Sequence, residues 1–354
     1  MPRMFKIFVD GQHGTTGLEI HRLLADRSEF ALLEVATADK KDPKVRQARL
    51  NEADAVVLCL PDDAAIDAVA LIESPDVRVL DASTAFRTDP AWAYGLPELP
   101  NQRTLLHGAK RVSNPGCYPT GFLLAVRPLI DAGILPSTLA LTVHAVSGYS
   151  GGGRKLIERF ESLAQHADSP DQLMHAQAYG LTLKHKHVPE MSHYSGTQLA
   201  PIFAPSVGHF YRGMLVCIPL FVNQLTRQAG QVVDRDQIQQ IWRNAYAGEA
   251  CVDVVAHDSQ LLDGYLDPQG ANFSNRVELA VYGNSEQLML IARLDNLGKG
   301  AAGAAVQNLN LMLGLPESTG LPNGERPAES ERAARVRGMG SQARMEELAG
   351  GTTA

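Results

Sequence analysis

One of the four cysteines stands where a nucleophile would be expected. Cys117 lies in the segment Ser-Asn-Pro-Gly-Cys-Tyr-Pro-Thr-Gly at 113–121, between turn residues and an apolar stretch that predicts a helix. Pro119 suits the first turn of that helix, where its missing N–H costs nothing. The positive end of the helix dipole favours a thiolate, so this setting predicts a nucleophilic thiol at Cys117.

The other cysteines, Cys59, Cys217 and Cys251, fall within apolar strand patterns. Cysteine in such a position is by default a small buried hydrophobe. Four cysteines without CxxC spacing do not make a disulfide framework, so a reducing, cytoplasmic setting fits the chain best. No metal site is expected, because no cysteine or set of acidic residues lies near the His-Lys-His segment at 185–187 to complete one.

Thiol chemistry of this kind needs a partner that transfers protons near neutral pH, and histidine is the ordinary choice. His185 and His187 flank a lysine in the segment His-Lys-His-Val-Pro-Glu. His187 is the first candidate for the acid–base group because it adjoins the Val-Pro-Glu turn, and His185 is the second. A strand-like alternation would place only one of the two side chains inward.

An anionic substrate would also need cationic and hydroxyl partners. Ser147, Ser150 and Arg154 belong to a glycine-rich loop just before a predicted helix, where free N–H groups can hold an anion. Arg87, just past a predicted strand, and Arg212 are further candidates for substrate binding. Each arginine could instead form a structural salt bridge, and the residues leave this open.

A glycine-rich turn near the start of the chain indicates a second ligand. Its spacing is GxxGxxG, directly after a predicted strand at 5–9 and before a predicted helix. Such glycines let the backbone turn tightly and approach a pyrophosphate at the helix N-terminus. A turn that serves packing alone is the alternative, because the motif by itself is weak. The candidate dinucleotide-binding residues of the turn are Gly11, His13, Gly14, Thr15, Thr16 and Gly17.

The choice between NAD and NADP depends on the residues after the second predicted strand. Asp39 in that segment would favour the ribose hydroxyls of NAD. A hydroxyl and three cations would instead favour the 2′-phosphate of NADP: Thr37, Lys40, Lys41 and Arg46. The residues alone do not decide between the two dinucleotides.

The order of predicted elements explains how these groups could meet. Strand and helix signals alternate through the first third, with strands expected at 5–9, 30–36, 55–60 and 77–80, which predicts a mostly parallel sheet with covered faces. From about Pro136 the strand candidates are longer and resemble an antiparallel sheet. We therefore expect an α/β fold, a Rossmann-like doubly wound nucleotide-binding domain with an inserted α+β catalytic domain.

Domain limits follow from this pattern. We expect the nucleotide-binding domain at 1–117 plus 297–315 and the α+β domain at 118–296. The segment 316–354 is polar and turn-rich, with few large apolar residues, which predicts a disordered tail.

The bulk composition excludes some classes of partner. A formal charge of −7 argues against a nucleic-acid partner, because phosphate backbones are bound by clustered cations. The N-terminus has no apolar signal-peptide core, and the most apolar stretches are too short to cross a bilayer. We expect a small-molecule substrate, no nucleic acid and no membrane.

Five motifs stand out along the chain: NPGCYPT at 114–120, SGYSGGGRK at 147–155, HKHVPE at 185–190, FAPSVGHFYRG at 203–213 and DNLGKGAA at 295–302. With these motifs in this order, the chain resembles the N-acetyl-gamma-glutamyl-phosphate reductase family from about residue 5 to 315. The short link at 40–54 is similar to the compact branch of the family.

The resemblance implies NADPH-dependent reduction of N-acetyl-gamma-glutamyl phosphate to N-acetylglutamate 5-semialdehyde, with release of phosphate, in arginine biosynthesis. It implies a thioester on Cys117, NADP(H) as cofactor, a semialdehyde-dehydrogenase-like fold with a dimerisation role for the second domain, and a homo-oligomer, either dimer or tetramer. Two alternatives are an aspartate-semialdehyde-dehydrogenase-like acyl-phosphate reductase, against which the Pro-Gly-Cys-Tyr-Pro-Thr setting argues, and a non-catalytic nucleotide sensor. A carrier-bound amino group on the substrate also stays open.

Overall fold

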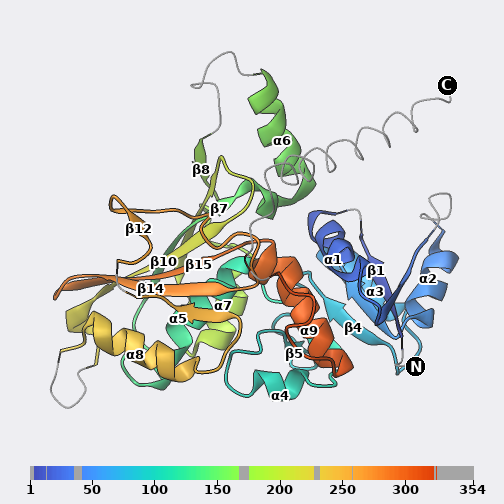
Figure 1. Cartoon of the computed structure of the whole chain (residues 1–354), viewed down its shortest axis with the longest axis horizontal. Helices are drawn as coiled ribbons and strands as arrows, with labels where there is room; N and C mark the ends of the chain where they lie inside the picture. The colour runs from blue at the N-terminus through green and yellow to red at the C-terminus, as the bar shows by residue number, and fades with distance from the viewer. Residues whose placement is uncertain are drawn as a thin grey trace.

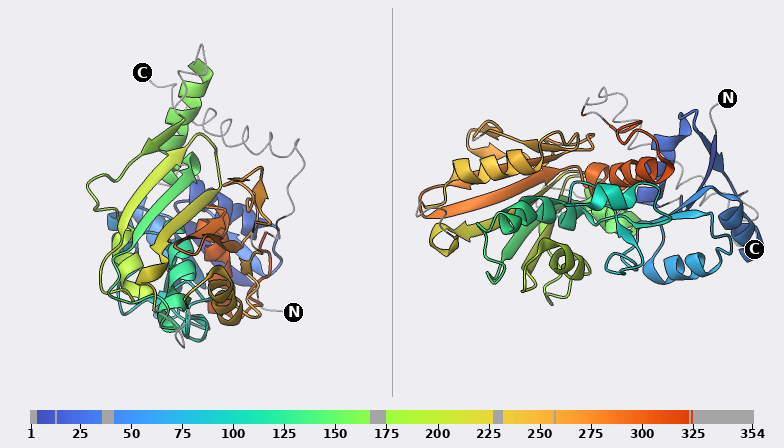
Figure 2. Two further views of the ribbon diagram at one scale, coloured as in Figure 1. Left: turned by 90° about the vertical axis from the view of Figure 1, so that its left-hand side faces the viewer. Right: turned by 90° about the horizontal axis from the view of Figure 1, so that it is seen from below.

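The computed structural model of the chain describes residues 4–12, 14–35, 42–166, 175–226, 232–256, 258–322 and 324. Two β-sheets lie toward opposite ends of the molecule, each with its own covering helices (Figures 1 and 2). The chain builds the first sheet, continues into the second, and returns to the first through its last helix.

The first sheet has six parallel strands in the order β2-β1-β3-β4-β6-β5. Its central strand β3 is buried on both faces and reads as a continuous apolar run, as expected for a parallel sheet between helix layers. The doubly wound nucleotide-binding fold is therefore confirmed. Its strands are β1 (Phe5–Asp10), β2 (Phe30–Leu33), β3 (Ala55–Leu58), β4 (Arg78–Asp81), β5 (Ala93–Tyr94) and β6 (Arg111–Ser113), and its helices are α1 (Thr15–Ala25), α2 (Pro43–Glu52), α3 (Asp62–Ala70) and α4 (Gln102–Leu106).

The second sheet has seven strands in the order β11-β14-β15-β10-β7-β9-β8. It is mixed rather than antiparallel as expected, because β7 pairs with β9 and β11 with β14 in parallel. One face packs on α5 (Cys117–Asp131), α7 (Val188–Ser195) and α8 (Arg235–Ala245) around a single apolar core. The strands are β7 (Thr142–Gly148), β8 (Ala176–Ala178), β9 (Ile202–Gly208), β10 (Met214–Phe221), β11 (Val252–Val254), β14 (Val277–Gly283) and β15 (Gln287–Leu294).

Shorter elements complete the second unit and the return to the first sheet. The helix α6 (Gly153–His166) follows the short helix η2 (Tyr149–Gly152) and projects away from the sheet (Figure 1). A hairpin of β12 (Leu261–Leu262) and β13 (Tyr265–Leu266) precedes β14, and η4 (Val222–Gln224) precedes α8.

The last described elements return to the nucleotide-binding sheet. A π-helical turn, η5 (Gly298–Ala302), leads into α9 (Gly303–Leu313), which packs beside α1 and α4. Ala302, Ala305 and Leu309 share the apolar core of β1 and β3. This arrangement supports a nucleotide-binding unit of 1–117 plus a return that begins at 297 and an α+β unit of 118–296, which we keep as our proposal for the two domains.

The boundary placed at residue 316 is too early. Glu317 accepts hydrogen bonds from Arg103 (2.8 Å) and Gln307 (2.7 Å), and Asn310 donates to the carbonyl oxygen of Thr319 (3.0 Å). The prediction of a disordered tail considered only the lack of large apolar residues and therefore missed these polar contacts. Residues 316–322 therefore pack on the body, and residues 325–354 lie outside the described part of the chain.

Truncation after Leu315 should destabilise the protein, in contrast to truncation after Gly324. The shorter chain leaves half-buried groups on Arg103 and Gln307 without Glu317, which costs about 1–3 kcal/mol for such groups. Thermal melting of both truncations and of the full chain checks this. Equal melting temperatures for the two truncations would show that residues 316–322 contribute nothing.

Candidate active site

A cleft of about 880 Å³ is lined by residues from both sheet units. The loop before α5, called here the thiol loop (residues 113–117), lies at this cleft together with the start of α1. Most sequence-predicted site residues meet here: Gly14, Thr15, Thr16, Gly17, Arg87, Cys117, Ser147, Ser150, Arg154, His185 and His187.

The glycine turn has the geometry that a dinucleotide requires. Gly11 has φ +86°, and a Cβ there would lie 2.3 Å from the carbonyl oxygen of Cys59. A Cβ on Gly17 would lie 2.3 Å from the carbonyl oxygen of Gly11, so α1 packs directly against the turn. The N–H groups of the first helical turn have no intrahelical acceptor and suit a pyrophosphate. The residues present therefore fit a dinucleotide.

Part of the predicted dinucleotide site cannot be compared with the structure. His13, Thr37, Lys40 and Lys41 lie outside the described residues. Arg46 on α2 donates from Nε to the carboxylate of Asp10 at 2.8 Å. Its buried Nη2 has no hydrogen-bond partner within the described ranges. A cation thus stands near the end of β1 with capacity to bind an anion.

Cys117 is the first residue of α5 and lines the cleft. Burial raises the pKa of its thiol to about 11, although the positive charge of Arg87 acts in the opposite direction. The helix dipole predicts a thiolate, whereas burial, the largest influence on this pKa, favours the protonated thiol in the ligand-free cleft. The thiol is protonated at neutral pH and needs a base.

A buried ion pair holds the thiol loop. Arg87 donates from Nη1 to Glu190 Oε2 (2.9 Å) and from Nε to the carbonyl oxygen of Asn114 (2.9 Å). Glu190 Oε1 accepts the backbone N–H of Gly116 (2.8 Å) and the hydroxyl of Tyr94 (2.7 Å). Arg87 thus supports the loop while it also lines the cleft. Sequence reasoning gave Glu190 no role, although the Pro-Glu pair at the start of α7 marked its position.

Both histidines face the cleft, and their rings lie 4.8 Å apart between centroids. The expected alternation is wrong because the segment is a turn rather than a strand, with Leu183 at φ +58°. Gly116 lies against His187: a Cβ on the glycine would be 2.6 Å from Nε2 of the imidazole. This places Nε2 of His187 next to the residue that precedes Cys117.

Electrostatics keep both histidines neutral in the ligand-free protein. Burial lowers the pKa of His187 well below its usual value, and the charges of Arg87 and Lys186 lower it further. Burial also lowers the pKa of His185. The buried Nδ1 of His187 has no hydrogen-bond partner in the part of the chain that the structure describes. A neutral imidazole of this kind can accept a proton.

Three more of the predicted substrate-binding residues line the cleft: Ser147, Ser150 and Arg154. Ser147 and Ser150 are buried at the cleft wall, where Ser150 Oγ accepts from Asn296 at 2.9 Å. Arg154 also lines the cleft and pairs with Glu158 one helical turn away. Lys186, which lies between the two histidines and also lines the cleft, was not predicted.

Arg212 does not reach the cleft. It is buried and pairs with Asp295 (3.1 Å) and Glu19 (3.4 Å), and its guanidinium stacks over Phe273. These contacts join α1 to the end of β15. The charge of Arg212 is therefore used in a structural ion pair, which is the alternative that the residues had left open, and we do not propose it for substrate binding.

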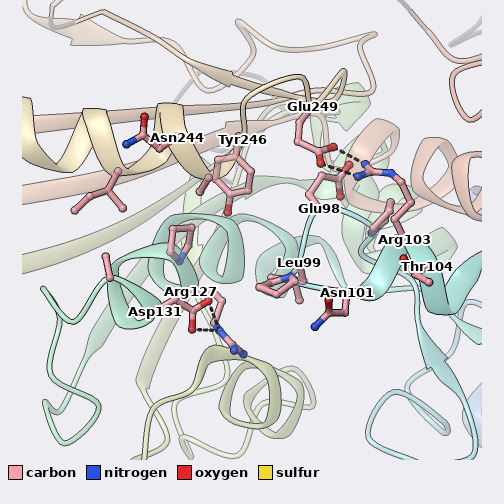
Figure 3. A pocket seen from close by; sticks show the side chains of 16 residues that line it. Glu98, Leu99, Asn101, Arg103, Thr104, Arg127, Asp131, Asn244, Tyr246 and Glu249 are labelled. Atoms are coloured by element: carbon pink, nitrogen blue, oxygen red, sulfur yellow. Dashed lines mark hydrogen bonds and ion pairs between the residues drawn. The ribbon is translucent and has the colours of Figure 1, made fainter.

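A second cleft of about 730 Å³ lies between α4, α5 and α8 (Figure 3). Four of its charged side chains form two pairs: Arg127 binds Asp131 at 2.8 Å, and Arg103 binds Glu249. It has no thiol among its lining residues. The cleft at Cys117 is therefore the better candidate for chemistry.

Neither a candidate metal site nor a candidate membrane span occurs in the described ranges. No group of three or more His, Cys, Asp or Glu side chains there is arranged to hold a metal ion. No helix within the same ranges combines the length and the apolar character that a membrane span requires.

Comparison with known proteins assigns both units. Residues 6–107 match the family described as "Semialdehyde dehydrogenase, NAD binding domain", and residues 117–296 match "Semialdehyde dehydrogenase, dimerisation domain". The chain is 49% identical over 322 residues to N-acetyl-gamma-glutamyl-phosphate reductase 2 of Nostoc sp., covering 89% of the chain and 99% of the relative. The relative of that name from Pseudomonas putida is 48% identical over 317 residues, with 89% and 98% covered.

Solved structures agree on the fold. Aspartate semialdehyde dehydrogenase II from Vibrio cholerae superposes with a TM-score of 0.66 at 15% identity, covering 88% of this chain and 98% of that one. The enzyme from Candida albicans, solved with NADP, gives 0.59 at 16% identity, with 88% and 99% covered. The chain therefore belongs to the semialdehyde dehydrogenase family and, within it, to the N-acetyl-gamma-glutamyl-phosphate reductases.

Proposed function

We propose that the cleft at Cys117 reduces N-acetyl-gamma-glutamyl phosphate to N-acetylglutamate 5-semialdehyde with NADPH, releasing phosphate, in arginine biosynthesis. The observation that carries this proposal is the meeting of Cys117, His187 and the glycine turn at one cleft. A thiol hydrolase would not need the turn, and a nucleotide sensor would not need the thiol.

In the first half of the reaction, Cys117 forms a thioester. Nε2 of the neutral His187 accepts the thiol proton, and the sulfur attacks the acyl carbon. The bond between that carbon and the phosphate oxygen breaks, and phosphate leaves with the proton that His187 carried. The raised pKa of the thiol makes the base necessary.

In the second half, the thioester becomes an aldehyde. NADPH, held at the turn of Gly11, Gly14 and Gly17 and the first turn of α1, supplies the hydride when bound. Hydride addition leaves an oxyanion on the former acyl carbon, and its collapse re-forms a carbonyl and breaks the bond between carbon and sulfur. The departing thiolate then takes a proton from solvent through His187, which regenerates the thiol.

The substrate's phosphate and carboxylate need positive or hydrogen-bonding partners. Ser147, Ser150 and Arg154 fit this role, and Lys186 and Arg87 add positive charge at the same cleft. Substrate anions would offset the cations that depress the pKa of His187. Binding of the substrate would thus make His187 a stronger base.

We infer that two copies associate through the open face of the second sheet. Alternate residues of β10 point away from the helix-covered core, among them Cys217 and the exposed Phe221. Cys217 stands opposite Ile291 of β15 across the ladder, so an apolar strip continues onto the neighbouring strand. The match to a dimerisation domain supports a homodimer, and a tetramer would need a further surface.

Ile291→Glu should convert the oligomer to a monomer, because a carboxylate would be buried in the proposed interface. Light scattering after size exclusion measures the mass. Leu262→Glu, on the exposed hairpin, is the matched control and should keep the wild-type mass. An Ile291→Glu protein of wild-type mass would place the interface elsewhere.

The rate at which iodoacetamide modifies Cys117 in the ligand-free protein should still increase above pH 9.0, the ordinary pKa of a thiol. The reason is that burial raises the pKa of this thiol to about 11. Mass spectrometry of the peptide that contains Cys117 gives the rate. Cys117→Ser is the control and should also abolish reduction while dinucleotide binding persists. A plateau near neutral pH would falsify the assignment of a protonated thiol.

His187→Asn should lower kcat by about a hundredfold or more, and His185→Asn by much less, with little change in stability. The pKa of His187 lies well below 6.5, so the base form is present above that pH and is lost only as the pH falls further. Wild-type kcat/KM should therefore stay level between about pH 6.5 and pH 8. A larger loss for His185→Asn would reverse the assignment.

NADPH should be preferred over NADH by at least about tenfold, the effect of one charge-assisted hydrogen bond to the 2′-phosphate. Arg46→Ala, and separately Lys40→Ala with Lys41→Ala, should raise the KM for NADPH selectively. Steady-state kinetics with N-acetyl-gamma-glutamyl phosphate and both dinucleotides measures this and tests the reaction itself. Preference for NADH would contradict the cofactor, and no turnover with either would contradict the function.

A further inference from the structure

A lysine in the turn beside Cys117 is buried without reaching the cleft. Lys299 lies in η5 and is 0% exposed. Its neighbours Gly300 and Ala301 line the cleft, and its own side chain points elsewhere. An ammonium group is rarely buried unless it is paired, so its partners indicate what it holds in place.

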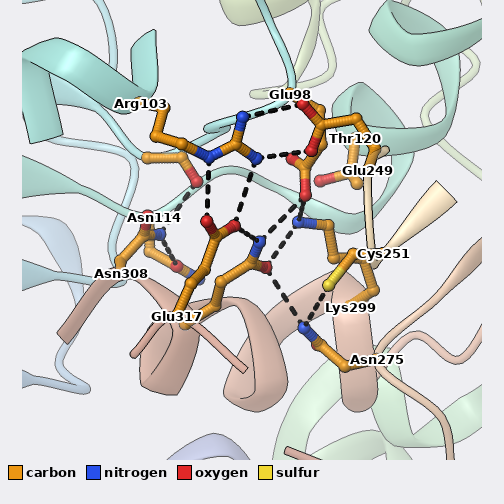
Figure 4. A network of polar contacts seen from close by, with 12 residues as sticks. Glu98, Arg103, Asn114, Thr120, Glu249, Cys251, Asn275, Lys299, Asn308 and Glu317 are labelled. Atoms are coloured by element: carbon orange, nitrogen blue, oxygen red, sulfur yellow. Dashed lines mark hydrogen bonds and ion pairs between the residues drawn. The ribbon is translucent and has the colours of Figure 1, made fainter. Parts of the chain in front are cut away.

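Those partners come from two other segments. Nζ of Lys299 lies 2.6 Å from Glu98 Oε1 and 2.6 Å from Gln307 Oε1, and the side chain of Glu98 is also fully buried (Figure 4). Gln307 donates to the same Glu98 oxygen at 2.9 Å. Glu98 belongs to the segment between β5 and α4, and Gln307 belongs to α9. The charge pair therefore ties η5 to the nucleotide-binding unit.

The same turn supports the thiol loop on its other side. A Cβ on Gly300 would lie 2.8 Å from the Cβ of Cys117, so the two backbones are in close contact. The carbonyl oxygen of Ala301 accepts a hydrogen bond from Asn114 Nδ2 at 3.1 Å. A shift of η5 would thus move Cys117 and the loop before it together.

We propose that Glu98 and Lys299 are positioning residues for Cys117. Their ion pair fixes η5, and η5 supports the sulfur-bearing residue through Gly300. Neither charged group lines the catalytic cleft, so the effect passes through the backbone. The kinetic part of this proposal rests on the proposed reductase activity, whereas the reactivity of the thiol can be measured without substrate.

The outer part of the polar network offers a matched control. Arg103 binds Glu249 and Glu317, and Glu317 accepts a hydrogen bond from Gln307, which contacts the inner pair (Figure 4). Arg103→Met breaks ion pairs of the same network and leaves the contact between Lys299 and Glu98 intact. It should lower the melting temperature without changing the thiol.

The test compares Lys299→Met, Glu98→Gln and the double variant with Arg103→Met in the full chain. Lys299→Met should lower kcat by at least about tenfold while the KM for the acyl phosphate stays within about twofold, because misplacement of a reacting group affects the chemical step. The rate of iodoacetamide modification at Cys117 should change by at least about threefold in the same variant. The double variant, which restores a neutral pair, should recover most of both losses.

Wild-type kcat and modification rate in Lys299→Met would overturn the proposal. Equal losses in Arg103→Met would also overturn it, because they would show general destabilisation. Should Lys299→Met fail to fold, Glu98→Gln alone must show the same split between kcat and KM. A wild-type protein inactive on the acyl phosphate would contradict the reaction instead, and the modification rates would then decide the positioning role.

Discussion

The carboxylate of Glu190 binds three residues, each at least 74 positions away from it in sequence, at the point where Cys117 begins its helix. One oxygen accepts the N–H of Gly116 and the hydroxyl of Tyr94, and the other accepts from Arg87. Arg87 in turn binds the carbonyl oxygen of Asn114. A buried ion pair is tolerated when its remaining hydrogen-bonding groups are satisfied, and here the thiol loop satisfies them. The ion pair can therefore stay buried only while the thiol loop keeps this shape, and the loop keeps this shape because the ion pair binds it.

This constraint sets the protonation states in the cleft. Burial raises the pKa of Cys117, and burial together with the charge of Arg87 lowers that of His187. Both groups are neutral before substrate binds, which suits a reaction that begins with transfer of the thiol proton.

Local patterns predicted the glycine turn and the thiol because each lies within a few residues of the helix it serves. Contacts between distant segments were not predictable in this way. Arg212 was assigned to substrate because its partners, Asp295 and Glu19, stand 83 and 193 residues away in sequence. The positioning role of Lys299 was missed for the same reason, since its partner lies 201 residues away. The strands followed from the apolar patterns, but the mixture of parallel and antiparallel neighbours in the second sheet did not.

The central claim is that the acyl group passes through a thioester on Cys117. Mixing the protein with N-acetyl-gamma-glutamyl phosphate in the absence of dinucleotide tests it most directly, because the intermediate should then accumulate. Intact mass spectrometry with peptide mapping should find the N-acetylglutamyl group on Cys117, and subsequent addition of NADPH should remove it as the aldehyde. An unmodified protein that nevertheless turns over with NADPH, or an adduct on another residue, would contradict the account.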